Sequence, residues 1–215
     1  MMTLKIDQLI PLPLGDRLRQ RDSGIWLRRL EWRQGEHIQL LAPSGSGKTT
    51  LVHILYGLRH DYEGSVSWNG TDIRGMNGAA LSGLRAEGLS IIFQDLRLFP
   101  ELTTRENLEL KRALTGTVAP GKTDEWMERL GIKHKADAPA HTLSYGEQQR
   151  AAIIRALLQP FKWLLMDEPF SHLDRANALE AAALIREAAQ ERNAALLLAG
   201  LDGDDYFEYT KTLRL

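Results

Sequence analysis

The stretch APSGSGKTT, residues 42–50, combines two glycines, a lysine and a threonine at a spacing that suits phosphate chemistry. Glycines let consecutive backbone N–H groups turn toward an anion, and a helix that follows presents its positive N-terminus to the same anion. Gly45 and Gly47 are placed for the first role. Lys48 can neutralise the β- and γ-phosphates of a nucleotide, and the Thr49 hydroxyl can ligate Mg²⁺. The pattern predicts a phosphate-binding loop, or P-loop.

The loop departs from the pattern G-x-x-x-x-G-K-[ST] at its first position, where Ala42 replaces glycine. Alanine adds only a methyl group, so we expect the loop to form. A flexible Gly-Ser linker is the alternative, but a linker fits poorly between an apolar strand and an apolar helix. We expect the whole run to bind the nucleotide: Pro43, Ser44, Gly45, Ser46, Gly47, Lys48, Thr49 and Thr50.

A second chemical element is the acidic pair Asp167 and Glu168, which follows the apolar run WLLM at 163–166. Such a run predicts a buried parallel strand, and parallel sheets bind ligands beyond the carboxyl ends of their strands. Asp167 can hold Mg²⁺ through its water shell. Glu168 can polarise the attacking water as a general base. Alone, the pair would equally suit a solvated acidic turn, but the upstream P-loop favours catalysis.

Residues 142–158, TLSYGEQQRAAIIRALL, contain a second anion site. Ser144 and Gly146 precede a strongly helical segment, so hydroxyl and backbone N–H groups gather at a helix N-terminus. A nucleotide that is already cradled by one P-loop does not need this second site within the same chain. The site therefore suits a nucleotide held by a partner chain.

The elements that must position these residues are predicted from periodicity and turn signals. Alternating and short apolar runs indicate strands, and apolar residues at helical spacing indicate helices. The chain thus runs from a strand through the Gly-rich loop into a helix. The expected elements are strands at 3–9, 25–32 and 37–42, helices at 49–58 and 177–193, and a turn-rich connection at 11–24.

Composition limits the class of protein. At 215 residues, with 43% hydrophobic and 26% charged residues, the chain has the size and composition of one globular domain, with or without a subdomain. A net charge of −1 gives no basic field for nucleic acid or an anionic bilayer. Cysteine is absent, which excludes disulfides and thiolate metal sites. No run approaches the roughly 18 apolar residues of a membrane span, so we expect a cytoplasmic chain.

Three motifs taken together resemble the ATP-binding cassette (ABC) ATPases: APSGSGKTT, LLMDEP, and LSYGEQQR, which looks like the family's signature motif. Their order and spacing match over essentially the full length. FQDLRLFPELTTREN at 93–107 resembles the Q-loop, with Gln94 as its glutamine, and the segment that receives a transporter's coupling helix. SHLD at 171–174 resembles the D-loop.

The resemblance implies an α/β fold, namely a P-loop NTPase with a RecA-like core, an antiparallel β-subdomain and an α-helical ABC subdomain. The chain would form a single ABC ATPase domain, 1–215. Its RecA-like core with the β-subdomain would occupy 1–94 and 158–215, and its helical subdomain with the signature motif would occupy 95–157.

The family's mechanism implies head-to-tail dimers, homo- or heterodimeric, with ATP between the Lys48 loop of one subunit and Ser144, Gly146 and Glu147 of the other. Gln94 would join Glu168 in catalysis, and would join Thr49 and Asp167 in the Mg²⁺ site. Hydrolysis would drive membrane permease subunits, contacted through the segment after Gln94, at the inner face of the cell membrane.

The cassette resembles the lipoprotein-release, macrolide-export and cell-division group, in which the membrane subunit chooses the cargo. A cassette that acts on DNA or ribosomes is disfavoured. Such proteins usually carry tandem cassettes or long coiled-coil insertions and basic surfaces, which a single chain at net charge −1 lacks. We therefore expect no nucleic-acid partner.

One family element is missing. The strand after the D-loop helix ordinarily ends in a switch histidine, commonly within Thr-His-Asp, which contacts the γ-phosphate. Aligning Asp202 with that Asp puts Leu201 at the histidine position and Gly200 at the threonine. None of the six histidines follows the D-loop; they are His37, His53, His60, His134, His141 and His172. His172, within the D-loop, could replace the switch histidine, but we expect it to be a packing or hydrogen-bonding residue instead.

Leucine neither donates nor accepts a hydrogen bond. Loss of one preorganised transition-state contact typically costs about 10²–10³ in rate. We therefore expect an ATPase that binds ATP normally and hydrolyses it slowly. The alternative is a degenerate ATP-binding clamp with little hydrolysis, paired with a competent cassette.

The family's adenine-stacking aromatic is also missing, because residues 9–23 contain no aromatic side chain. Leu12 or Leu14 could supply apolar contact instead. Trp26 lies too close to the next strand and is expected in the core. The same segment is rich in arginine, and we expect a solvated loop rather than contacts to nucleotide or lipid at Arg17, Arg19 and Arg21.

Overall fold

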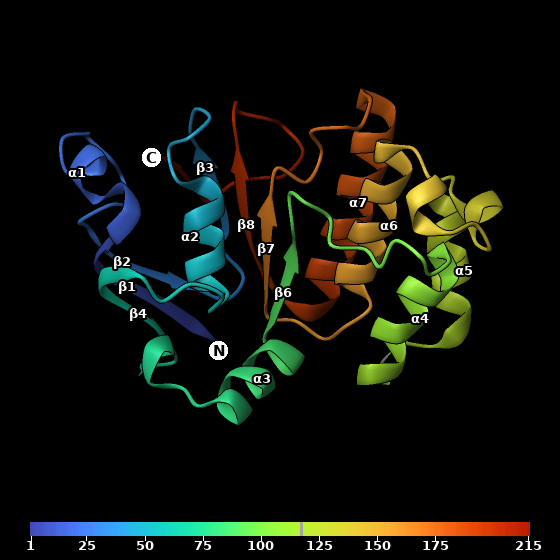
Figure 1. Cartoon of the computed structure of the whole chain (residues 1–215), viewed down its shortest axis with the longest axis horizontal. Helices are drawn as coiled ribbons and strands as arrows, with labels where there is room; N and C mark the ends of the chain where they lie inside the picture. The colour runs from blue at the N-terminus through green and yellow to red at the C-terminus, as the bar shows by residue number, and fades with distance from the viewer. Residues whose placement is uncertain (117) are drawn as a thin grey trace.

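A parallel sheet forms the centre of the computed structural model, which describes residues 1–116 and 118–215. Its strand order is β6-β7-β8-β3-β9, and every pairing is parallel. The carboxyl ends of β3, β7 and β8 therefore meet along one edge (Figure 1), where ligands bind in such sheets. The strands are β3 (His37–Leu41), β6 (Leu89–Ile92), β7 (Trp163–Asp167), β8 (Ala195–Gly200) and β9 (Lys211–Arg214).

A second, antiparallel sheet has the order β2-β1-β4-β5. Its strands are β1 (Thr3–Pro11), β2 (Arg29–Arg33), β4 (Tyr62–Trp68) and β5 (Thr71–Asp72). The expectation of a strand from residue 25 was wrong. The backbone N–H groups of Ile25 and Trp26 donate to Ser23 Oγ at 3.0 Å each. This local turn takes both residues into the core before β2 begins.

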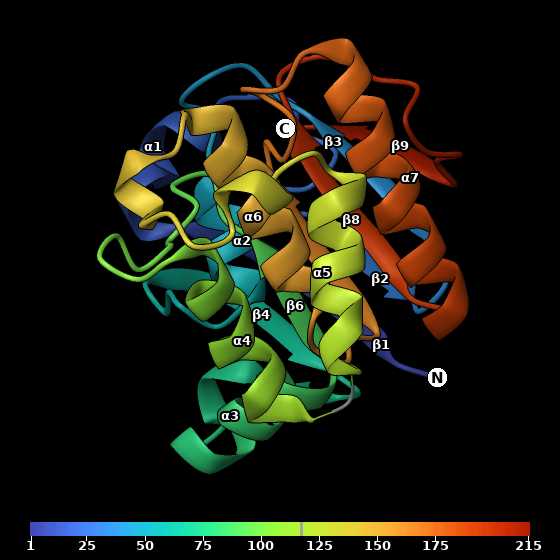
Figure 2. The same ribbon diagram turned by 90° about the vertical axis from the view of Figure 1, so that its right-hand side faces the viewer.

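Helices cover both faces of the parallel sheet (Figure 1). α2 (Lys48–Leu55) packs on β7 and β8, and α6 (Tyr145–Leu157) packs on β6 and against α7 (Arg175–Arg192). α4 (Thr104–Thr115) and α5 (Pro120–Arg129) lie beyond α6 (Figure 2). α3 (Gly78–Glu87) packs on β6. Across the two described ranges, no helix combines the length and apolarity needed to cross a membrane.

The connection between β1 and β2 folds as two short helical turns, η1 (Leu12–Leu14) and α1 (Gly15–Leu18). Leu18 is only 2% exposed and anchors the segment in the core. Sequence predicted a turn-rich connection here, and the buried leucine explains why it takes one defined conformation.

Two tryptophans join the sheets. Trp68 from β4 and Trp163 from β7 are fully buried and meet edge to face, with ring centroids 5.3 Å apart. The indole N–H of Trp68 donates to the carbonyl of Leu55 at the end of α2, at 3.0 Å. Edge-to-face aromatic pairs are directional, so this contact fixes the antiparallel sheet relative to the parallel sheet and α2.

Gly64 in β4 lies where the chain leaves no room for a side chain. Its φ is +80°, and an added Cβ would lie 2.3 Å from the carbonyl oxygen of Gln8. We expect Gly64→Ala to lower the free energy of unfolding by about 3 kcal/mol, because the strained backbone and the clash add. Gly70→Ala is the matched control, since Gly70 has φ +81° and no atom within 4 Å of its Cβ position.

We expect the control to lose about 1 kcal/mol, which is the backbone strain without the clash. Urea denaturation of both variants, followed by circular dichroism, measures the difference. Equal losses would show that β1 moves away from Gly64 without cost.

Candidate functional site

Lys48 is the centre of the loop between β3 and α2. Its side chain is 5% exposed. The ammonium donates to the carbonyls of Ala42 at 2.8 Å and Pro43 at 3.2 Å, and it pairs with Glu168 Oε1 at 3.2 Å. Gly47, just before α2, has φ +100°, a conformation that favours glycine. The loop thus holds a buried cation at the N-terminus of a helix.

Ala42 takes the place of the first glycine without backbone strain, since its φ is negative. It is 2% exposed, and its N–H donates to the carbonyl of Gly200 at the end of β8, at 3.0 Å. The methyl group is therefore accommodated in the core beneath the loop.

Four of the predicted site residues form a connected set of contacts. The Thr49 hydroxyl donates to Gln94 Oε1 at 3.1 Å, and Gln94 Nε2 donates to Glu168 Oε2 at 3.5 Å. The Lys48–Glu168 ion pair completes the set. These side chains come from α2, from the segment after β6 and from the segment after β7. They line a cleft of about 290 Å³ together with Leu14, Ser44, Gly45, Gly47 and Thr50.

Asp167, the last residue of β7, is 1% exposed. Neither of its carboxylate oxygens has a hydrogen-bond partner in the part of the chain that the structure describes. Burial raises the pKa of Asp167, and the Glu168 charge adds to the rise, whereas the nearby Thr49 hydroxyl and Lys48 ammonium oppose it. In the structure the Thr49 hydroxyl lies 3.1 Å from Gln94 Oε1, its hydrogen-bond partner. A buried carboxylate without partners calls for a ligand.

The donor set fits Mg²⁺, which prefers hard oxygen ligands and keeps several waters. The Thr49 hydroxyl, the Gln94 amide oxygen and the Asp167 carboxylate supply such oxygens. Within the described ranges, no group of three or more His, Cys, Asp or Glu side chains is arranged to hold a metal ion. A bound Mg²⁺ would therefore rely on hydroxyl, amide and phosphate oxygens as well as on a carboxylate.

Glu168 has a left-handed backbone with φ +49°, which is strained for a residue with a side chain. Its N–H donates to the carbonyl of Ala199 in β8 at 2.9 Å. Its carbonyl accepts from Ser171 Oγ and Gln149 Nε2, both at 3.1 Å. Gln149 Oε1 in turn accepts the N–H of His172 at 3.0 Å. The candidate base is thus held from β8, from α6 and from its own turn.

Gln149 had no role in the sequence-based prediction. The sequence does contain a signal for its role, since this glutamine occupies the otherwise apolar face of α6. In the structure Gln149 is 1% exposed. A buried amide must find partners. The backbone around Glu168 provides them.

The signature residues lie apart from the P-loop cleft. Ser144 and Glu147 form a capping box at the start of α6: the Glu147 N–H donates to Ser144 Oγ at 3.3 Å, and the Ser144 N–H donates to Glu147 Oε2 at 2.8 Å. At Gly146 an added Cβ would lie 3.0 Å from the carbonyl oxygen of His172. None of these three predicted residues lines the cleft that contains Lys48.

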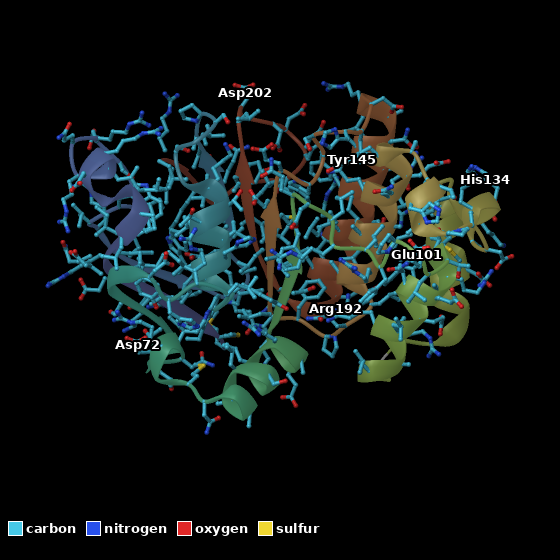
Figure 3. The ribbon with its side chains drawn as sticks, viewed as in Figure 1. Asp72, Glu101, His134, Tyr145, Arg192 and Asp202 are labelled. Carbon is cyan, nitrogen blue, oxygen red and sulfur yellow. The ribbon has the colours of Figure 1, made fainter. Side chains whose placement is uncertain are left out.

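Tyr145 marks the exposed start of α6. It is 49% exposed, and its ring lies 4.2 Å from the ring of His172, centroid to centroid. Figure 3 labels Tyr145 beside α6 and Asp202 at the end of β8, both on the upper side of the view. His172 therefore packs against the signature helix, and it does not line the P-loop cleft.

Leu201 follows β8 and is 50% exposed. Together with Glu168, Phe170 and Leu198 it lines a second, mainly apolar pocket of about 140 Å³. No histidine lines this pocket or the P-loop cleft. Residue 201 thus borders a pocket that the candidate base also borders, but it brings no polar group.

The wall of the cleft nearest β1 is apolar. Leu14 lines the cleft, whereas Leu12 is 56% exposed on the surface. Trp26 is 3% exposed, and a Cβ on Gly47 would lie 3.1 Å from its ring. The prediction of a core position for Trp26 is confirmed.

A third depression, of about 250 Å³, follows the Q-loop. Phe99, Leu110 and Leu114 line it, and they are 56%, 46% and 81% exposed. Arg155 also lines it and donates to the carbonyls of Leu96 and Arg97, both at 2.5 Å. Exposed apolar side chains around a groove are typical of a protein-docking surface.

Comparison with known proteins supplies the family. The family model described as "ABC transporter" matches residues 28–171. The chain is 38% identical over 174 residues to the thiamine import ATP-binding protein ThiQ of Cereibacter sphaeroides, covering 80% of this chain and 73% of that protein. It is 35% identical over 172 residues to the lipoprotein-releasing system ATP-binding protein LolD of Shewanella frigidimarina, covering 79% and 72%.

Among solved structures, the fold is similar to the dimeric bacterial ABC transporter cassette MJ0796. The TM-score is 0.77 at 24% identity, over 93% of this chain and 88% of that chain. The predicted α/β fold with a P-loop core and an antiparallel sheet is confirmed by this similarity and by the observed strand order.

Proposed function

The chain belongs to the ABC transporter family and is the ATP-binding subunit of such a transporter, and we propose that it hydrolyses ATP in a head-to-tail dimer to drive membrane permease subunits. The observation that carries this proposal is the connected set of contacts among Lys48, Glu168, Gln94 and Thr49 in front of the partnerless Asp167. It combines a phosphate cradle, a metal-ligand set and a base in one cleft.

In this proposal Lys48 exchanges the Glu168 carboxylate for phosphate oxygens when ATP binds, while the loop N–H groups and the start of α2 hold the remaining phosphate charge. Glu168, released from Lys48, accepts a proton from the attacking water. Gln94 orients that water and Glu168 through its amide. Thr49, Gln94 and Asp167 would hold Mg²⁺, which when bound neutralises charge on the β- and γ-phosphates.

The dimer is proposed because Ser144, Gly146 and Glu147 lie outside the chain's own cleft. They stand at an exposed helix N-terminus, which suits an anion held by another subunit. The dimeric state named for MJ0796 supports a dimer for this chain as well. The second cassette can be a copy of this chain or a different one.

We place the permease contact on the groove after Gln94, around Phe99, Leu110 and Leu114. We also propose that residues 95–157 act as a helical subdomain against a core formed by 1–94 and 158–215. The groove lies between the two, since Tyr56 and Phe93 of the core also line it. This places the chain at the inner face of a membrane.

Hydrolysis is proposed to be slow, because Leu201 brings no hydrogen-bonding group to the pocket that it shares with Glu168. The same observation favours a second candidate function, an ATP-dependent clamp with little turnover that pairs with a competent cassette. The intact set of Gln94, Asp167 and Glu168 favours the ATPase.

Lys48→Ala tests the proposed nucleotide site. We expect ATP affinity to fall about 10²-fold, because one truncated member of a buried charge pair costs on the order of 2–5 kcal/mol. Isothermal titration calorimetry measures the affinity, and circular dichroism checks the fold. Lys133→Ala is the control, since Lys133 forms a surface pair with Glu128. Unchanged ATP affinity in a folded Lys48→Ala protein would overturn the proposed function.

A further inference from the structure

The segment between β1 and β2 forms a fixed wall of the P-loop cleft. Leu18 anchors it in the core, and Leu14 lies 3.4 Å from the position of a Cβ on Gly47. The backbone holds the short helix as well, since the Arg19 N–H donates to the carbonyl of Gly15 at 2.9 Å. Leu14 of this segment lines the cleft, and the short helix that follows it is held close to the P-loop.

Arg17 lies directly against the P-loop. Its Nη2 donates to the carbonyl of Gly45 at 2.9 Å. A Cβ on Gly45 would lie 3.6 Å from Nη2 and 3.9 Å from Nη1, so both terminal nitrogens of the guanidinium lie close to the loop backbone. Gly45 itself lines the cleft with Lys48 and Thr49. A cation thus lies at the entrance to the phosphate-binding loop.

The charge of Arg17 is not neutralised within the described part of the chain. Arg19 pairs with Glu63 at 2.5 Å and Arg28 with Asp22 at 3.0 Å, so what sets Arg17 apart from these two is an open charge. Arg21 also forms no ion pair with a described residue, but Arg17 is the one that contacts the P-loop. No described carboxylate forms an ion pair with Arg17, and its hydrogen bond within the described residues goes to one backbone carbonyl, that of Gly45. A guanidinium has five N–H donors, so most of its capacity remains for a ligand.

We propose that Arg17 is a further nucleotide ligand, which leaves the Gly45 carbonyl and binds the polyphosphate of ATP beside the P-loop. This inference rests on the proposed ATP-binding function. A planar guanidinium matches two phosphate oxygens, whereas an ammonium binds as a point charge. The sequence-based expectation of a solvated loop is thereby replaced at Arg17 and kept at Arg19, whose charge is already paired.

Arg17→Ala is expected to weaken ATP binding about 10-fold, which is the usual effect of losing a charge-assisted hydrogen bond. Arg17→Lys should recover part of this loss. Arg19→Ala, on the same turn, is the matched control and should bind ATP like the natural chain. Equilibrium titration with a fluorescent ATP analogue, competed by ATP, gives all three affinities. Wild-type affinity in a folded Arg17→Ala protein would overturn the proposal.

Inorganic triphosphate distinguishes a phosphate contact from stacking on the base. In Arg17→Ala the affinity for triphosphate should fall by the same factor as the affinity for ATP. Both losses of affinity should be smaller at high salt. A loss for ATP with no loss for triphosphate would place Arg17 on the base and overturn the proposed contact. Lys48→Ala separates the two proposals: if it binds ATP normally, the nucleotide site itself is wrong, whereas a defect in Lys48→Ala alone refutes only Arg17.

Discussion

Glu168→Gln is expected to reduce ATP turnover about 10³-fold while ATP remains bound, because a positioned general base typically contributes 10²–10⁴ to the rate. Glutamine keeps the shape of the side chain and can still contact Gln94, but it cannot accept the proton of the attacking water. Phosphate release measures the loss. We also expect ATP to hold the variant as a dimer, which light scattering after size exclusion detects.

The control is Glu180→Gln, because Glu180 on α7 forms a surface ion pair with Arg129 of α5 and does not line the P-loop cleft. It should turn over ATP like the natural chain and show no ATP-dependent dimer beyond that of the natural chain. Undiminished turnover in Glu168→Gln would remove Glu168 from the base role. A variant that binds ATP but stays monomeric would contradict the head-to-tail dimer.

Leu201→His is expected to raise turnover about 10²–10³-fold, the range that one preorganised transition-state contact supplies. Residue 201 borders the same pocket as Glu168 and is half exposed, so an imidazole there can enter the pocket of the candidate base without displacing core packing. Steady-state phosphate release with saturating Mg-ATP, alone and with the permease, provides the measurement.

Leu179→His is the matched control, because Leu179 is 43% exposed on α7 and lies away from the cleft. A gain in Leu201→His that is absent from Leu179→His would identify the missing histidine as the cause of slow hydrolysis. If neither variant gains activity and the natural chain already turns over ATP rapidly, another group holds the water, and slow hydrolysis is wrong.

Much of the site could be predicted because its chemistry is local in sequence. The P-loop and the acidic pair each follow a buried strand directly, and a parallel sheet brings such strand ends to one edge. Lys48, Thr49 and Glu168 therefore meet without any knowledge of the rest of the fold. The link to Gln94 came from family resemblance, and the observed hydrogen bonds give it a physical basis.

Contacts that depend on where a connection packs could not be predicted. Arg17 is one of several arginines in its segment, and only the buried Leu18 and the course of the short helix decide that it, rather than Arg19, reaches Gly45. Gln149 likewise contacts the Glu168 carbonyl only because α6 packs next to the turn that contains Glu168. The turn at Ile25 shortened a predicted strand, because burial and a serine hydroxyl outweighed the alternating pattern.

The pair Trp68 and Trp163 has a consequence for the cleft, although it lies at the opposite end of β7. The wall that carries Arg17 continues from the antiparallel sheet, whereas the P-loop continues from the parallel sheet, so the cleft spans the junction between two layers. A ligand bound across this junction contacts both layers. Linkage makes this coupling reciprocal. A bound nucleotide stabilises the relative position of the two sheets, and a stiff junction between the sheets favours nucleotide binding by the same free energy.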